Sequence, residues 1–223
     1  MTDKPFKTIT EQIEILRARN LTFIDEVTAA QYLAANGYYE IINGYKTTFL
    51  TDDNETFKDG TTFEDIFALY YFDTKIRTAV MSSIDFIESF LKQKLAYLLA
   101  EKHGEQFTDY VSKEVFSSGN TLKHPSSRRH LYTDRDLLFN KFAESANRNY
   151  DPFKHYKLNH KNTPPWILVK DIDFGCLRTA IKLLNKDDKR TLIARIFSAE
   201  TIANLSYEQL NVFFGELILI INK

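Results

Sequence analysis

The sequence predicts an all-α protein, built as a helical bundle on one long central helix with additional helices before it. Apolar residues recur at spacings of three and four over most of the 223 residues, as on one face of a helix. Clear alternation of apolar and polar residues, the pattern of a half-buried strand, is found nowhere. No repeat of solenoid length is visible either. Together these observations favour helices packed on helices.

The first 60 residues predict two helices and a short turn. Thr8 and Glu11 form a capping box before a helix that ends near Asn20. A second helix is expected from about Glu26 to Asn36, ended by Gly37. The stretch NGYYEIINGYK, residues 36–46, predicts a short helical turn between two Asn-Gly bends, because Asn-Gly favours positive φ. Residues 51–60 predict a polar surface loop.

The longest periodic segment begins after a predicted capping box of Thr61 and Glu64. No Gly or Pro interrupts it before Gly104, so we expect one helix of about 40 residues or two nearly collinear ones. Asp73 and Arg77 are spaced to form an ion pair on this helix, and Glu88 lies on the same side. The segment carries an apolar stripe of Val80, Ile84, Ile87, Leu91, Leu95 and Leu98.

Periodicity fades from Gly104 to Tyr132, and residues 123–130 predict a basic loop. Helices are expected again from Thr133, over 166–170, after 174–175, over 187–197, after Ser198 and from Ser206, where Gln209 completes a capping box. We therefore divide the chain into an N-terminal helical region, 1–60, packed on a helical core, 61–223. The core has a basic insert at 104–161, and the whole is expected to form a single compact unit.

Composition excludes several classes of protein. The single cysteine, Cys176, rules out an internal disulfide framework and a cysteine-rich zinc site. The spacings of His124 with His130 and of His155 with His160 do not put two imidazoles on one helical face, so we expect no metal. Nucleotide-binding and hydrolase motifs are absent, and we expect no cofactor. No signal peptide or membrane-spanning run is visible, which predicts a cytoplasmic location and no membrane partner.

The net charge of −1 hides a basic middle. Residues 123–161 hold nine Lys and Arg against four Asp and Glu, interleaved with tyrosines and Phe153. Cations on phosphates and aromatic rings under bases are the usual means of holding single-stranded RNA. The alternative is an ordinary solvated loop region. The candidate RNA-binding residues are Lys123, Arg128, Arg129, His130, Lys154, Lys157 and Lys161.

Two blocks carry a family resemblance: NGYYEIINGYK, residues 36–46, and PPWILVKDIDFG, residues 164–175. They resemble the signature blocks of the Abi-like family, the AbiD/AbiF group of bacterial abortive-infection proteins. The start KPFKTITEQIEILRARNL and the central helix resemble the family as well, with Phe72, Asp73, Arg77, Ile87 and Glu88 at its recurring positions. The similarity spans Lys4 to Lys223 in the expected order.

The resemblance implies an HEPN-type helical protein that defends bacteria against phage as a metal-independent endoribonuclease toxin. It also implies RNA partners, both a target and a small antitoxin RNA, and a homodimer. The family's catalytic signature is Arg-Asn-x-x-x-His on the last helix, where the histidine acts on the ribose 2′-OH and the arginine stabilises the phosphate.

This signature does not occur in the sequence. If Asn222 is its asparagine, Ile221 stands in place of the arginine, and the histidine falls beyond Lys223. We therefore expect the catalytic signature to be truncated and this chain to be a poor ribonuclease or none. Candidate catalytic residues are Asn222, Glu88, Arg77 and Asp73. The alternatives are that the last three form structural pairs, and that the protein is a non-catalytic RNA-binding or protein-interaction module.

Overall fold

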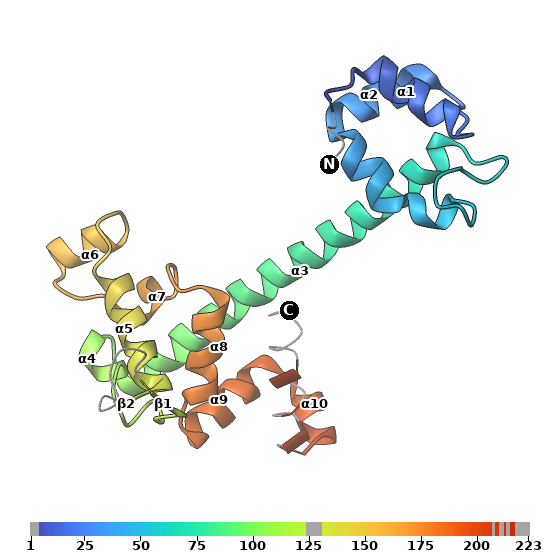
Figure 1. Cartoon of the computed structure of the whole chain (residues 1–223). Helices are drawn as coiled ribbons and strands as arrows, with labels where there is room; N and C mark the ends of the chain where they lie inside the picture. Colours follow the sequence, from blue (N-terminus) through green and yellow to red (C-terminus); the bar gives the residue numbers. More distant parts are fainter. Residues whose placement is uncertain (1–4, 124–130, 207, 210–211, 213–214, 217–223) are drawn as a thin grey trace. The chain divides into compact units, whose positions relative to one another are not determined.

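The computed structural model is mostly helical, which confirms the predicted all-α class (Figure 1). It describes all residues except 1–4, 124–130, 207, 210–211, 213–214 and 217–223. The elements up to the end of the long helix are α1 (Ile9–Ala18), α2 (Glu26–Asn36), the π-helical turn η1 (Tyr39–Asn43), the 3-10 turn η2 (Lys46–Phe49) and α3 (Phe63–His103). Those after it are α4 (Phe107–Tyr110), β1 (Thr121–Lys123), β2 (Leu131–Thr133), α5 (Asp134–Ala146), α6 (Phe153–Asn159), α7 (Pro165–Leu168), α8 (Phe174–Leu183), α9 (Lys186–Ile196) and α10 (Ala199–Asn204).

The chain divides into two compact units, residues 1–82 and 83–223, and the division lies within α3. The first turns of α3 pack among the N-terminal helices, where Phe63 and Ile66 are buried with Leu16 and Leu33. The domains expected from the sequence, 1–60 and 61–223, stay a prediction. Each unit has its own hydrophobic core. That the chain forms a single compact unit stays a prediction.

The first unit confirms one predicted helix cap and corrects another. The Thr8–Glu11 capping box is present at the start of α1. At α3 the capping residue is Thr62, whose hydroxyl accepts from the backbone N–H of Asp65. Thr61 is displaced from that role because its carbonyl accepts a hydrogen bond from the backbone of Thr22. Glu64 accepts from the backbone N–H groups of residues 24 and 25 instead, so it ties α3 to the start of α2.

The stretch 36–46 is helical, as predicted, but has only one of its two predicted bends. Gly37 has φ 87° and ends α2. Gly44 has φ −67°, an ordinary helical value, because the π-helical turn η1 runs through it toward η2. Ile41 and Ile42 of η1 are fully buried in the core of the first unit. The turn is therefore a packing element of that core.

The second unit is built on the C-terminal half of α3, with α5, α8 and α9 around it (Figure 1). Leu91, Leu95 and Leu98 of the predicted stripe lie in its core, together with Leu177 and Leu192. The earlier part of the predicted stripe is not buried to the same extent, since Val80 is 51% exposed. The predicted capping box of Ser206 and Gln209 is confirmed by reciprocal hydrogen bonds between side chain and backbone.

One short antiparallel pair of strands accompanies the helices among the described residues. β1 and β2 pair with Leu122 opposite Tyr132. Each strand has only three residues, too few for the alternation that identifies a strand in a sequence. In the part of the chain that the structure describes, no helix is long and apolar enough to cross a membrane.

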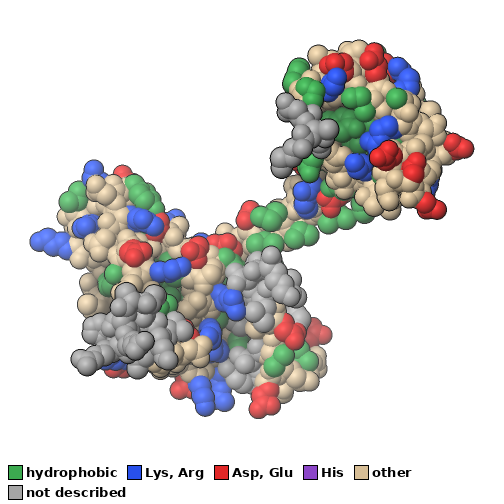
Figure 2. Space-filling model, viewed as in Figure 1, with side chains coloured by type: hydrophobic (Ala, Val, Ile, Leu, Met, Phe, Trp, Pro, Cys, Tyr) green, Lys and Arg blue, Asp and Glu red, His purple; other side chains and the backbone are tan. Residues whose placement is uncertain are grey.

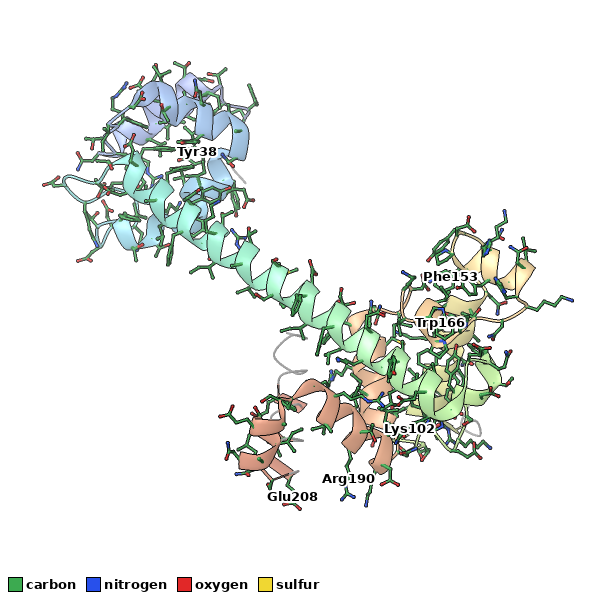
Figure 3. The ribbon with its side chains drawn as sticks, turned by 180° about the vertical axis from the view of Figure 1, so that it is seen from behind. Tyr38, Lys102, Phe153, Trp166, Arg190 and Glu208 are labelled. Atoms are coloured by element: carbon green, nitrogen blue, oxygen red, sulfur yellow. The ribbon has the colours of Figure 1, made fainter. Side chains whose placement is uncertain are left out.

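A buried carboxylate joins the end of α3 to the start of α9. Asp188 is 2% exposed. Its oxygens accept from Lys102 Nζ at 3.0 Å and from Asn185 Nδ2 at 2.7 Å, and lie 2.7 Å from His103 Nε2. Burial raises the pKa of the Asp188 carboxyl, but the hydrogen bonds from Lys102 and His103 outweigh burial and hold this pKa below its ordinary value of 3.8. Figure 3 labels Lys102 at this position.

We predict that Asp188→Asn lowers the free energy of unfolding by about 3 kcal/mol at pH 7, because it removes the charge of the buried carboxylate that pairs with Lys102 and His103. A depressed pKa stabilises the fold above the unfolded-state pKa, and this contribution is lost as the pH falls below about 4. Urea unfolding of the unchanged protein and the variant should therefore give a smaller difference in the free energy of unfolding at pH 3 than at pH 7. Asp187→Asn, one residue away and exposed, is the control. An equal loss for both variants would contradict the role of Asp188.

Candidate nucleic-acid interface

The second unit carries a basic helix, α6, that is anchored by one buried aromatic residue. Phe153 is 1% exposed and lies edge to face with Tyr150, with ring centroids 5.7 Å apart. Figure 3 labels Phe153 at the start of this helix. Lys154 and Lys157, three residues apart, share a side of α6 and are exposed. Lys and Arg side chains gather over the region of α5 and α6 on the face shown in Figure 2. Phe153 is thus the one buried residue of a helix whose exposed residues include Lys154, Lys157 and Leu158.

A pocket of about 360 Å³ lies beside α6 and brings two of the predicted lysines together. Lys157 and Lys161 line it with Asn147, from the end of α5, and Asn162. Lys157 Nζ donates to Asn147 Oδ1 at 3.2 Å. Two lysines and two asparagines therefore line one surface hollow. Its apolar lining comes from Phe107, Ala143 and Ala146.

The hydrogen bonds of Asn162 and the backbone conformation of Lys161 position the lining of the pocket. Asn162 donates to the carbonyl of Glu105 at 2.9 Å and accepts from the N–H of Phe107 at 3.0 Å, so its amide is fixed at both ends. Lys161 has φ 49°, in the left-handed region that a non-glycine residue occupies at a cost of about 1 kcal/mol. It follows the last residues of α6, where such a conformation turns the chain away from the helix. That turn brings Lys161 to the same pocket as Lys157.

Two histidines lie close together at the end of α6. The ring centroids of His155 and His160 are 5.7 Å apart, and the Tyr156 ring lies 5.9 Å from the first and 5.0 Å from the second. Asn159 Nδ2 lies 3.0 Å from His155 Nδ1. The spacing of five residues does not predict this contact on a regular helix. It forms because α6 ends at Asn159 and His160 begins the turn that follows.

The other predicted RNA-binding residues either do not line this pocket or lie outside the described residues. Lys123 ends β1, and its backbone pairs with Leu131. Arg128, Arg129 and His130 lie outside the described residues. Lys154 lies on α6 but does not line the pocket. The structure therefore brings together Lys157 and Lys161, with Lys154 one turn before them.

The candidate catalytic residues of α3 form ion pairs within the helix. Arg77 Nε lies 3.0 Å from Asp73 Oδ2, as their spacing predicted. The hydroxyl of Tyr45, from the block 36–46, donates to Asp73 at 2.5 Å and accepts from Arg77 Nη2 at 3.3 Å. The hydrogen bond to Asp73 raises the pKa of Tyr45. Tyr45 thus links residues 36–46 to α3, a contact that sequence spacing does not predict.

Glu88, the third of these residues on α3, pairs with Lys92 at 2.6 Å. Asn222 lies outside the described residues. A catalytic role for Asp73, Arg77, Glu88 and Asn222 stays a prediction. The observed contacts agree with the structural alternative for the three residues on α3, since each has a partner one turn away.

Metal and thiol chemistry find little support in this part of the molecule. Among the described residues, no group of three or more His, Cys, Asp or Glu side chains is arranged to hold a metal ion. Cys176 is 3% exposed, and burial raises the pKa of its thiol to about 11. A thiol with that pKa stays protonated near neutral pH and is a poor nucleophile.

The family described as Abi-like protein matches residues 31–222. The chain therefore belongs to the Abi-like family and is a protein of the abortive-infection type. Both signature blocks, residues 36–46 and 164–175, lie within the matched range. No match was found among curated proteins or among solved structures.

Proposed function

We propose that this Abi-like protein acts in phage defence by binding single-stranded RNA at the pocket beside α6. The observation that carries the proposal is the convergence of Lys157 and Lys161 with the amides of Asn147 and Asn162 in one hollow. Lysine ammonium groups bind phosphates without regard to sequence, and their strength depends on local rather than net charge. The net charge of −1 is therefore compatible with RNA binding.

The chemistry around the pocket favours RNA over a simple anion. The amide of Asn147 can bind sugar hydroxyls or base edges, while Tyr156 and the two neighbouring histidines offer rings on which unpaired bases stack. Each stacked base contributes about 1–3 kcal/mol in single-strand binding proteins. The pocket offers groups for the phosphate and sugar of an unpaired nucleotide, and the rings of α6 and the turn after it, which do not line the pocket, offer a surface for its base.

We predict that the double variant Lys157→Ala, Lys161→Ala weakens binding to a single-stranded RNA at least tenfold at low salt, because two phosphate contacts are lost. The slope of log affinity against log salt should fall by about 1.4, or about 0.7 for each lysine. Fluorescence anisotropy with a labelled oligonucleotide at several salt concentrations measures both quantities.

The matched control removes two lysines elsewhere. Lys75→Ala, Lys186→Ala changes the net charge equally, and both residues are exposed and neither lines the pocket. The control should bind RNA within about twofold of the unchanged protein. Equal losses in the two double variants would mean that binding reflects net charge, which would overturn the proposal for this pocket.

A finer proposal is metal-independent RNA cleavage at the same face, supported by the proximity of His155 and His160. One imidazole removes the proton of a ribose 2′-OH, and the 2′-oxygen attacks the adjacent phosphorus. The bond from phosphorus to the 5′-oxygen breaks, and the other imidazole, as imidazolium, protonates that oxygen. The products are a 2′,3′-cyclic phosphate and a 5′-hydroxyl. Lys157 stabilises the charge that develops on the phosphate.

We predict that His155→Ala and His160→Ala each reduce RNA cleavage about 100-fold or more, the usual effect of losing an acid or a base. RNA affinity should change less than threefold, and EDTA should not affect the rate. Product analysis should find 2′,3′-cyclic phosphate ends. Asn159→Ala, which keeps both rings, should retain most of the activity. Unchanged cleavage in both histidine variants, or inhibition by EDTA, would contradict this mechanism.

The alternative, a non-catalytic RNA-binding or protein-interaction module, predicts RNA binding with no cleavage by the unchanged protein. HEPN character, a homodimer and a small antitoxin RNA belong to this proposal as features implied by the family resemblance. An antitoxin RNA is consistent with the α6 pocket, because one single strand bound there would block another.

A further inference from the structure

A second hollow in the same unit, a groove of about 730 Å³, shares no lining residue with the α6 pocket. Its floor includes Ala96 and Ala100, one turn apart on α3, and its sides include Tyr97 and Trp166. Tyr97 is 63% exposed and Trp166 is 38% exposed. Figure 3 labels Trp166, which comes from α7. Small residues beside two accessible rings leave room for a flat ligand to lie against an aromatic surface.

A guanidinium and a carboxylate meet in this groove. Arg195, from α9, pairs with Glu101 of α3, and its guanidinium carbon lies 5.2 Å from the centre of the Tyr97 ring. Arg195 Nη1 is buried and has no hydrogen-bond partner among the described residues. An unsatisfied buried donor costs free energy, so a small movement of Arg195 toward a ligand acceptor is favoured. The groove therefore presents both a donor and an acceptor next to its rings.

A second cation lies farther along the groove. Lys94 lines it, with its ammonium nitrogen 5.1 Å from the centre of the Phe90 ring. Lys94 and Glu101 are seven residues apart on α3, about 10 Å along the helix axis. One part of the groove thus offers a donor and an acceptor beside aromatic rings, and another offers a positive charge for a phosphate.

We propose that this groove binds a guanine nucleotide. The guanine base lies against Trp166 and Tyr97, Arg195 donates to its O6 and N7 acceptors, and Glu101 accepts from its N1–H and exocyclic N2–H groups. Lys94 binds the phosphate. Adenine has an amino donor where guanine has O6, so the arginine discriminates against it. The nucleotide is either free or part of an RNA strand. This proposal does not rest on the function proposed for the α6 pocket.

The single tryptophan of the chain, Trp166, gives a direct readout. A guanine stacked on the indole quenches its fluorescence. We expect GMP to quench this emission with saturation, and AMP to require at least a tenfold higher concentration. The oligonucleotides AAGAA and AAAAA test the strand-bound source. Quenching by GMP alone identifies a free nucleotide as the ligand. Quenching by AAGAA but not by AAAAA identifies a guanine base within RNA. Both outcomes support the proposed site.

Variants test the groove residue by residue. Arg195→Gln and Tyr97→Ala should each raise the Kd for GMP, or for AAGAA where only the strand binds, at least tenfold. Tyr39→Ala, which removes an exposed tyrosine from the first unit, should not change it. Thermal unfolding shows whether each variant is folded. If Tyr97→Ala does not fold, Trp166→Phe, which keeps an aromatic ring in the groove, replaces it, and its binding is measured by calorimetry.

Two results would overturn the proposal: no quenching by either GMP or AAGAA, or equal quenching by the guanine and adenine ligands. The double variant Lys157→Ala, Lys161→Ala separates this site from the α6 pocket. It should bind GMP, or AAGAA where only the strand binds, with unchanged quenching whether or not RNA binding at α6 is lost.

Discussion

The rest of the structure depends on one constraint, that a single uninterrupted helix supplies apolar residues to two separate cores. Phe63 and Ile66 at the start of α3 are buried in the first unit, and Leu91, Leu95 and Leu98 near its end are buried in the second. This requires helical periodicity over 41 residues without a break. The helix stops at Gly104, whose φ of 110° suits only glycine, and where an added Cβ would lie 2.8 Å from Asp109. The chain then turns directly to Phe107, which lines the α6 pocket.

Both candidate sites of the second unit are built outward from the end of this helix. Asn162 fixes the pocket by bonding to Glu105 and Phe107, the residues just after α3. The groove uses the preceding turns of α3 directly, through Tyr97 and Glu101. Asp188 holds α9, which carries Arg195, against Lys102 and His103. The fold thus explains why a basic pocket and an aromatic groove occur in a protein with nearly neutral net charge.

The sequence predicted those features that depend on residues close together in the chain. The Thr8–Glu11 cap and the Asp73–Arg77 pair are local, and both are present. Features that depend on tertiary contacts were not predicted from the sequence. Thr61 does not cap α3, because its carbonyl accepts a hydrogen bond from Thr22, and β1 and β2 are too short to be recognised in the sequence. Basic composition identified Lys157 and Lys161 as candidates for RNA binding. Their pocket partners Asn147 and Asn162, and the presence of Trp166 and Arg195 in one groove, require the folded chain.

Photo-crosslinking shows whether RNA binds at the face of α6, as we propose. A single-stranded RNA containing 4-thiouridine is bound to the whole protein and irradiated, and the crosslinked peptides are identified by mass spectrometry. We expect crosslinks concentrated within residues 147–163, with Tyr156 and His160 among the modified positions. Crosslinks confined to the first unit, residues 1–82, would contradict this proposal.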